Sequence, residues 1–331
     1  MKNQIKTEPV IELLKGTREY LSGVEIGARL GLTRAAIWKR INALRKKGYL
    51  IEGSPTKGYK LIESPDLSIE EIRNALSKGS HKIGSNLLFY KTVASTNALC
   101  AEMAHKGSKE GLVIIADEQT SGRGRLGRTW VSPAGKNLYM SILLIPPIAP
   151  RDATILTLMS GVACCIALRK LLLIPIHLKW PNDLIANDKK IGGILTEISA
   201  DMDKIYRAVI GIGININADS DDFPEEVRQI ATSVQKETGS QFGRTEIALE
   251  VLKEFDRWYE ILLTNGKKDI LSEWRDCSST IGRKVKVTIG NQVFKGIAEE
   301  IDQEGLLILK LFDGSFMKVD AGDVTMLREG E

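Results

Sequence analysis

The chain has 331 residues, of which 43% are hydrophobic and 27% are charged. This length allows two or three domains, and this composition is typical of soluble proteins with a sizeable core. The amino-terminal MKNQIKTEPV lacks the apolar centre of a signal peptide, and the longest apolar run, residues 153–168, is too short to span a membrane. The cysteines show neither metal-ligand nor disulfide spacing, which favours a reducing cytoplasm. These cysteines are Cys100, Cys164, Cys165 and Cys277.

The net charge of +4 is unevenly distributed along the chain. Residues 1–65 carry 13 Lys and Arg against 6 Asp and Glu, which gives +7 and leaves 33 against 36, or −3, for the remainder. A basic segment joined to a slightly acidic body indicates nucleic acid as a partner of the first segment only.

The basic segment, residues 1–65, is predicted to be a winged helix-turn-helix domain. Apolar spacing predicts a first helix over residues 10–21, and Ser22 with Glu25 forms a cap for a second helix that ends at Gly31. A third, basic helix begins at the cap Thr33 and continues as far as Gly48. A turn of about three residues between the second and third helices is the helix-turn-helix arrangement. The following residues, 49–62, predict a β-wing around the turn 53–58.

The third helix is predicted to present one face to the core and the other to DNA. Ile37, Ile41 and Leu44 share the inner face. The residues expected to contact DNA are Thr33, Arg34, Ala35, Trp38, Lys39 and Arg40, together with Lys57 of the wing. The alternative is a small helical domain with a solvated basic face, but the cap, turn and wing follow one another in the order that DNA binding requires.

Residues 81–278 are predicted to form an α+β domain, preceded by a linker helix over residues 66–80 that begins with the cap Ser68-x-x-Glu71. Strands and helices alternate irregularly here, which predicts a mixed sheet with helices packed on it. The expected strands are 86–93, 111–116, 137–145, 176–180, 183–185, 191–199 and 205–216, and the expected helices are 96–106, 152–173 and 246–263.

Residues 279–331 are predicted to form a small SH3-like antiparallel barrel. From about Gly282 the apolar period changes from 3.6 to 2, and the short apolar runs are separated by turn sequences at residues 290–291, 304–305 and 313–314.

The segment 122–130, GRGRLGRTW, places Arg123, Arg125 and Arg128 among three glycines. Glycines let backbone N–H groups approach a phosphate, and guanidinium groups match its oxygens, so the loop is a candidate anion site. The segment is one residue away from a P-loop, but residues 130–135 break a helix where a P-loop would begin one. Taken alone, the loop is equally consistent with a solvated basic loop or a nucleic-acid patch.

Four further segments of this region carry polar groups that each have an ordinary structural explanation. Ser95-Thr96-Asn97 opens a helix, and KWPND (179–183) is a turn between two strands. KKIGGIL (189–195) begins a strand with paired glycines, and GIGININ (211–217) places Asn215 and Asn217 on one side of a strand.

Taken together and in this order, STN, Q-x-x-GRGR-x-GR-x-W, KWPND, KKIGGIL and GIGININ resemble the signature series of the bacterial biotin protein ligases. The resemblance extends over nearly the whole chain, and it implies the class II synthetase-like fold of that family for residues 81–278. The basic winged-helix domain makes the chain similar to the bifunctional members that also repress the biotin operon, since shorter members lack this domain.

The resemblance implies two half-reactions. In the first, biotin and ATP give biotinyl-5′-AMP and pyrophosphate. Mg²⁺ is held mainly by the ATP phosphates and not by a protein metal site. A lysine of biotin carboxyl carrier protein then takes the biotinyl group. The implied catalytic residues are Arg123, Arg125, Lys190 and Asp183, of which Asp183 receives or orients the acceptor lysine. The implied biotin contacts are Ser95, Thr96, Asn97, Gln119, Gly122, Arg123, Arg125, Lys190 and Gly193. The implied ATP and adenylate contacts are Arg123, Arg125, Arg128, Lys179, Asn182, Lys190 and Asn215.

The same resemblance implies that biotinyl-5′-AMP favours a homodimer and acts as corepressor on operator DNA, in the cytoplasm and without a membrane partner. The glycine-rich loop and residues 218–231 are expected to close over the adenylate. Two rival functions stay open: a transcription factor whose ligase domain only senses a ligand, and a lipoate or octanoate ligase of related fold.

Overall fold

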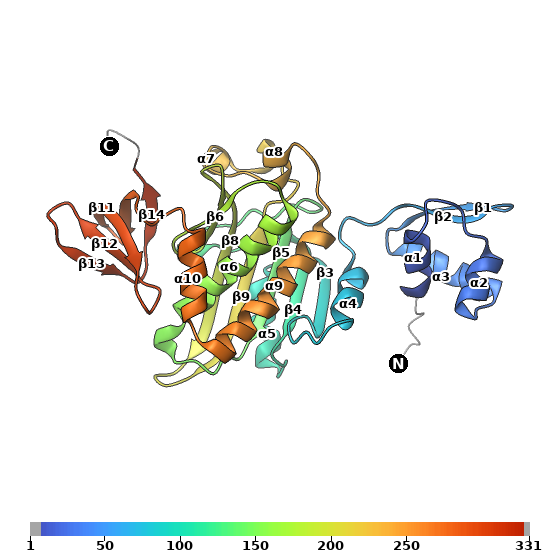
Figure 1. The fold of residues 1–331 in the computed structure, drawn as a ribbon, viewed down its shortest axis with the longest axis horizontal. Helices are drawn as coiled ribbons and strands as arrows, with labels where there is room; N and C mark the ends of the chain where they lie inside the picture. Colours follow the sequence, from blue (N-terminus) through green and yellow to red (C-terminus); the bar gives the residue numbers. More distant parts are fainter. Residues whose placement is uncertain (1–7, 328–331) are drawn as a thin grey trace. The chain divides into compact units, whose positions relative to one another are not determined.

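The computed structural model describes residues 8–327, which divide into two compact units, one ending at Lys78 and the other beginning at Gly79 (Figure 1). The elements of the first unit are α1 (Glu8–Lys15), α2 (Gly23–Leu30), α3 (Arg34–Lys46), β1 (Leu50–Ser54), β2 (Gly58–Glu63) and α4 (Ile69–Ser77). Its core is formed by apolar residues from all three leading helices, among them Val10, Leu14, Ile26, Ile37, Ile41 and Leu44.

The predicted winged helix-turn-helix is confirmed in this first unit. Ser22 accepts a hydrogen bond from the Glu25 N–H at 3.1 Å, and Thr33 accepts one from the Ala36 N–H at 3.2 Å, so both caps form as the sequence indicates. Helix α1 ends at Lys15, six residues earlier than predicted for a helix reaching Leu21. Leu21 is extended because it exchanges backbone hydrogen bonds with Tyr59 of the wing.

Helix α4 packs on the winged helix. Ser68 caps it by accepting from the Glu71 N–H, and the Tyr49 hydroxyl lies 2.8 Å from both the Ser68 hydroxyl and a Glu71 carboxylate oxygen. Burial is the main cause that raises the pKa of Tyr49, so this phenol stays protonated and holds α4 against the wing.

The second unit contains the predicted mixed sheet. Its seven strands have the order β3-β4-β5-β9-β8-β7-β6, with β3 and β4 parallel and the other neighbours antiparallel. The strands are β3 (Asn86–Val93), β4 (Leu112–Gln119), β5 (Leu138–Leu144), β6 (Ile176–Lys179), β7 (Asp183–Ala186), β8 (Lys189–Ala200) and β9 (Ile205–Ile214).

One strand boundary matters for the site. Strand β9 ends at Ile214, so Asn215 and Asn217 follow the strand, and the prediction that both lie on it was wrong. The Asn215 carbonyl instead accepts a hydrogen bond from the Val234 N–H at 3.0 Å, because the chain turns here to meet residues 231–235.

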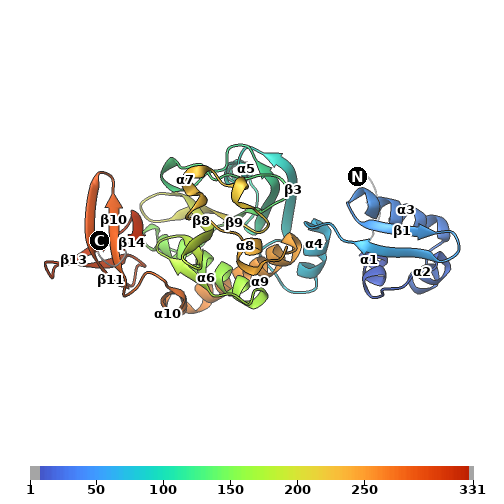
Figure 2. The same ribbon diagram turned by 90° about the horizontal axis from the view of Figure 1, so that it is seen from above.

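Helices cover both faces of the sheet (Figure 2). Helices α6 (Thr154–Leu171), α9 (Arg244–Asn265) and α10 (Lys268–Cys277) lie along one face, and α5 (Thr96–His105) lies on the other. Helix α6 is long and apolar enough to cross a membrane, but it is a core helix because most of its residues are buried. Helix α10 was missed by the sequence analysis, although Ile270, Leu271, Trp274 and Cys277 are its buried stripe.

Short elements complete the sheet domain. They are the 3₁₀ turns η1 (Arg125–Gly127), η2 (Pro150–Asp152) and η3 (Ser220–Asp222) and the helices α7 (Glu225–Arg228) and α8 (Val234–Thr238). None of them was predicted individually, because each is shorter than two helical turns and carries no periodic signal.

The C-terminal part is a five-stranded antiparallel sheet, as the period of 2 predicts. Its order is β13-β12-β11-β10-β14, and its strands are β10 (Lys284–Ile289), β11 (Gln292–Ile301), β12 (Leu307–Leu311), β13 (Phe316–Val319) and β14 (Asp323–Met326). We call this part the C-terminal β-domain. Trp180 Nε1 donates to the Gly305 carbonyl at 3.1 Å and Arg275 donates to the Ile301 carbonyl at 2.8 Å, which fix this domain against the larger sheet.

Gly305 tests how much this docking contributes to stability. It has a φ of +80°, and a Cβ there would lie 2.6 Å from Leu158 Cδ1 of α6. We expect Gly305→Ala to lower the free energy of unfolding by about 1–3 kcal/mol, through backbone strain and overpacking. Gly314→Ala is the matched control, because Gly314 has a φ of +87° with open space around it. Equal losses in thermal unfolding of the two variants would contradict a role for the close approach to α6.

Candidate functional site

One cavity of about 610 Å³ lies in the second unit, where the loop after β4 crosses the sheet. Its walls come from α5, from the loop 123–131, from β6 to β9, from residues 223–231 and from β14. Its charged lining residues are five cations, Arg123, Arg125, Arg128, Lys179 and Lys190, and three anions, Asp183, Glu226 and Asp323. The lining therefore carries a net charge of +2, which suits an anionic ligand.

The start of α5 forms a buried polar end of the cavity. The Thr96 N–H and hydroxyl both donate to Gln119 Oε1, at 2.8 and 3.0 Å, and the Ser141 hydroxyl lies 2.6 Å from Asn97 Oδ1. A Cβ at Gly211 would lie 2.4 Å from Asn97 Oδ1, so β9 needs glycine there for the amide to reach this position. These side chains are fixed before any ligand arrives.

The loop 122–130 folds back on itself as a narrow hairpin. The Trp130 N–H donates to the Gly122 carbonyl at 2.9 Å, and the Gly124 N–H donates to the Arg128 carbonyl at 2.7 Å. A Cβ at Gly122 would lie 2.3 Å from the Trp130 carbonyl oxygen, so only glycine fits. The hairpin presents its arginines from a closely fixed backbone.

Trp130 covers the sheet at the centre of the cavity. A Cβ at Gly213 would lie 2.7–2.8 Å from three atoms of its indole, and Lys190 Nζ lies 5.4 Å from the indole centroid. The indole Nε1 is buried without a hydrogen-bond partner in the described part of the chain. This donor is therefore available to a ligand that enters beside the ring.

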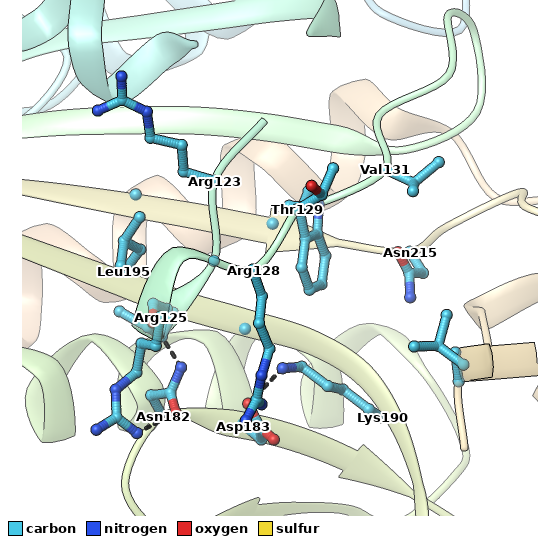
Figure 3. A pocket seen from close by; sticks show the side chains of 18 of the residues that line it. Arg123, Arg125, Arg128, Thr129, Val131, Asn182, Asp183, Lys190, Leu195 and Asn215 are labelled. Carbon is cyan, nitrogen blue, oxygen red and sulfur yellow. Dashed lines mark hydrogen bonds and ion pairs between the residues drawn. The ribbon is translucent and has the colours of Figure 1, made fainter. Parts of the chain in front are cut away.

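Two of the loop arginines reach across the cavity to other parts of the fold (Figure 3). Arg125 Nη1 donates to Asn182 Oδ1 at 3.2 Å and to the Gly322 carbonyl at 3.3 Å, and Arg128 forms an ion pair with Asp323. Burial lowers the pKa of Arg125. The nearby Arg128 charge lowers it further, while Asp183 opposes the shift. In Figure 3 Arg123 points away from this group.

A second charged pair lies beside them. Lys190 Nζ of β8 is 2.6 Å from Asp183 Oδ1 of β7. Burial lowers the pKa of Lys179, and the neighbouring Lys190 and Arg128 charges lower it further, while Asp183 opposes the shift. The site therefore holds Lys179, Lys190 and Arg128 close enough for their charges to repel one another.

Residues 218–233 border the open side of the cavity. The Lys190 N–H donates to the Ile230 carbonyl at 2.7 Å, the Thr232 N–H donates to the Lys190 carbonyl at 2.9 Å, and Asn215 Nδ2 donates to the Thr232 carbonyl at 3.0 Å. This segment is thus hydrogen-bonded to the strand that carries Lys190, and its Phe223, Val227 and Ile230 give the cavity an apolar side.

The structure brings nearly all of the predicted site residues together. The cavity is lined by Ser95, Thr96, Asn97, Gln119, Arg123, Arg125, Arg128, Lys179, Asn182, Asp183, Lys190, Gly193 and Asn215. Gly122 does not line it and acts through the hairpin backbone. The sequence analysis missed Trp130, Glu226 and Asp323 as lining residues. Trp130 had a signal, the strand glycines opposite it, whereas nothing in the sequence connects Asp323 with the loop.

The first unit places its predicted DNA-contacting residues on an exposed face of α3. Ile37 and Ile41 are fully buried, whereas Arg34, Ala35 and Lys39 are exposed and Trp38 is 58% exposed. Arg45, at the end of α3, donates to the Ile51 carbonyl with Nε at 3.0 Å and Nη2 at 2.8 Å, which holds the wing against the helix.

Within residues 8–327 no group of three or more His, Cys, Asp or Glu side chains is arranged to hold a metal ion. The four cysteines are buried free thiols. The cavity itself offers cations, polar anchors and the Asp183 carboxylate, which is paired with Lys190.

Comparison with known proteins agrees with this geometry. Residues 89–215 match the biotin/lipoate A/B protein ligase family, residues 6–60 match an HTH domain and residues 280–327 match the biotin protein ligase C-terminal domain. Among solved structures, the biotin protein ligase from Aquifex aeolicus in complex with biotin and ATP is 30% identical, with a TM-score of 0.63, and covers 74% of this chain and all of that one.

Two curated relatives are similar over almost the full length. The bifunctional ligase/repressor BirA of Bacillus spizizenii is 36% identical over 98% of this chain and 100% of its own length. That of Escherichia coli is 33% identical over 93% of each. With the helix-turn-helix unit, the ligase sheet and the C-terminal β-domain all present, the chain belongs to the family of bifunctional ligase/repressor BirA proteins.

Proposed function

We propose that this protein is an ATP-dependent biotin protein ligase that also represses transcription in response to biotin. The observation that carries the proposal is one cavity in which a fixed polar end, at Ser95–Asn97, meets four cations. They are Arg125 and Arg128 of the loop 122–130, Lys179 of β6 and Lys190 of β8. A neutral polar headgroup and a polyphosphate would fit at the two ends. The Aquifex aeolicus structure, which contains biotin and ATP, supports this choice of ligands.

The polar end is suited to the biotin headgroup. Asn97 Nδ2 donates to the Leu195 carbonyl and to Glu197, while Thr96 and Gln119 are joined by two hydrogen bonds, so the donors and acceptors have fixed directions. In our proposal Ser95, Gly122 and Gly193 complete the biotin site. The valerate chain then extends toward Lys190, Arg123 and Arg125.

The cationic end is suited to adenylate formation. A biotin carboxylate oxygen attacks the α-phosphorus of ATP, a new P–O bond forms, the bond to the β-phosphate oxygen breaks and pyrophosphate leaves. Two anions must approach, so cations fixed beforehand lower the barrier more than mobile ones would. We assign this work to Arg125, Arg128 and Lys190, joined by Arg123 once it turns toward the phosphates, with Lys179, Asn182 and Asn215 holding the nucleotide. Mg²⁺ would be bound mainly by the phosphates, since the described residues offer no cluster of carboxylates for it.

The second half-reaction needs an acceptor lysine without its proton. The amine attacks the acyl carbon, the amide bond forms and AMP leaves. Asp183 is our candidate for orienting the amine and receiving its proton. Asp183 is paired with Lys190 before ligand binding, and a phosphate that draws Lys190 away would free its carboxylate for the acceptor. The Lys190–Asp183 ion pair would then make the second half-reaction follow the first.

The substrate is tested by supplying ATP and a carrier domain with either labelled biotin or labelled lipoate. We expect label on the carrier lysine with biotin only, because the rigid polar end matches a headgroup with both donors and acceptors. Transfer of lipoate instead would establish the rival ligase, and transfer of neither would favour a protein that only senses its ligand.

The cation assignment is tested by Arg125→Ala and Lys190→Ala. Each is expected to reduce adenylate synthesis roughly 100-fold, the usual effect of losing one preorganised charge contact, measured as biotin-dependent exchange of pyrophosphate into ATP. Lys189→Ala is the matched control, since Lys189 is exposed and does not line the cavity. Wild-type exchange in both site variants would exclude the assignment.

Asp183→Asn separates the two half-reactions. We expect adenylate to form and to accumulate while transfer to the carrier slows, because only the second step needs a proton acceptor. Single-turnover measurements on preformed adenylate read the second step alone. An equal loss in both steps would instead show that Asp183 serves mainly to hold Lys190.

Repression follows if the adenylate is bound better by the form of the protein that dimerises and binds DNA. Two α3 helices would then meet two operator half-sites, in the cytoplasm where carrier protein and DNA are both present. Operator DNA is first selected from a random pool by this protein. Biotin plus ATP is then expected to increase the affinity of the protein for this DNA roughly 5- to 150-fold at fixed salt. Sedimentation under the same conditions should show the dimer. An affinity unchanged by biotin plus ATP would contradict the corepressor role.

A further inference from the structure

The base of the wing carries a cluster of side chains of which only Lys57 has been given a role, as an expected DNA contact. Lys57 Nζ lies 5.7 Å, and Lys60 Nζ 5.8 Å, from the centroid of the Tyr20 ring. Glu52 lies opposite Lys60 in the β1–β2 ladder. We call Tyr20, Lys57 and Lys60 the wing-base cluster.

The backbone fixes the position of Tyr20 beside the wing. The next residue, Leu21, exchanges backbone hydrogen bonds with Tyr59, both at 2.9 Å. Gly58 has a φ of +105°, and a Cβ there would lie 2.1 Å from the Leu21 carbonyl oxygen. Only glycine permits this approach, so the segment that carries Tyr20 is held against β2 by a single β-bridge.

This arrangement brings like charges together. Two ammonium groups within about 6 Å of one aromatic ring repel each other, and the electron-rich ring face offsets part of that repulsion. Glu52 supplies one negative charge against two positive ones, so one positive charge remains. The Glu52 carboxylate beside the Tyr20 hydroxyl raises the pKa of this phenol, which therefore keeps its proton as a hydrogen-bond donor.

The cluster lies on the wing of the DNA-binding unit. Arg45 of α3 donates two hydrogen bonds to the Ile51 carbonyl of the wing, which ties the hairpin to this helix. Lys57 is exposed at the hairpin turn, and the segment 1–65 has a net charge of +7. Two lysines oriented by a ring lose less side-chain entropy on meeting a phosphate than free lysines do.

We propose that the wing-base cluster is a phosphate-binding site for the DNA backbone, in which Tyr20 positions Lys57 and Lys60. The proposal rests on DNA binding by the first unit and adds Tyr20 and Lys60 to the interface. Its contacts are independent of base sequence, because they are made to phosphates.

The salt dependence of binding tests this with no knowledge of the operator. The full-length protein with biotin and ATP is titrated onto a fluorescent random-sequence 40-base-pair duplex over a series of salt concentrations. Each lost phosphate contact lowers the slope of log affinity against log salt by about one. We expect Lys57→Gln and Lys60→Gln each to lower the slope by about one per protomer, with roughly 3- to 10-fold weaker binding at 0.1 M salt.

Tyr20 is tested by two variants that differ in the ring. Tyr20→Ala is expected to lower the slope as the lysine variants do, whereas Tyr20→Phe keeps the ring and the slope. Lys204→Gln, an exposed lysine in the turn between β8 and β9, is the matched control and should leave the slope unchanged. Circular dichroism and pyrophosphate exchange confirm that each variant folds.

Three results would overturn the proposal or its premise. Slopes unchanged in Lys57→Gln and Lys60→Gln would show that the cluster does not contact phosphates. A lowered slope in the lysine variants but not in Tyr20→Ala would remove the positioning role of the ring. Failure of the wild-type protein to bind any duplex would instead contradict DNA binding itself.

Discussion

The proposed ligase site depends on holding cations together in a partly buried cavity. Burial lowers the pKa of both Arg125 and Lys179, which measures the tendency of such groups to lose their charge. The fold opposes this with acceptors from distant parts of the chain: Asn182, Asp183, the Gly322 carbonyl and Asp323. The site is therefore complete only when the loop, the large sheet and the C-terminal β-domain are assembled. A bound triphosphate would also keep these cations charged, because it carries more negative charge than the protein acceptors do.

Glycine at points of close approach is the second constraint, and it follows from the first. Cations can be fixed only on a backbone that does not move, and the loop packs on the sheet where a strand has glycine in place of a side chain. Gly213 admits the Trp130 indole, Gly211 admits Asn97 and Gly122 lets the hairpin close. At each position a methyl group would meet another atom at less than 3.0 Å. Gly211 and Gly213 of the GIGININ motif thus shape the cavity wall.

The sequence predicted the parts of this protein that depend on local chemistry. Caps at Ser22, Thr33 and Ser68, the helix-turn-helix and the mixed sheet all follow from residue type and spacing. The resemblance supplied the grouping of the loop arginines with Lys190 and Asp183. Asp323, the first residue of β14, lies 195 residues beyond Arg128, and no local pattern records which cation its carboxylate will meet in the folded state. The end of β9 was misplaced for a related reason, since pairing of Asn215 with residues 232–234 replaced the strand that its spacing favoured.

The two proposed anion sites share one physical device, a lysine held over an aromatic ring, in different surroundings. In the cavity Lys190 lies over the half-buried indole of Trp130, and at the wing Lys57 and Lys60 lie near the half-buried ring of Tyr20. An aromatic face holds a lysine without neutralising it, so the cation stays available to a phosphate. The cavity walls around Lys190 restrict the first site to a ligand that fits between them. At the wing Lys57 is exposed at the hairpin turn, which leaves this site subject to screening by salt and indifferent to sequence, as a contact to the DNA backbone must be. In this proposal the surroundings of each lysine, and not its chemistry, decide which phosphate it meets.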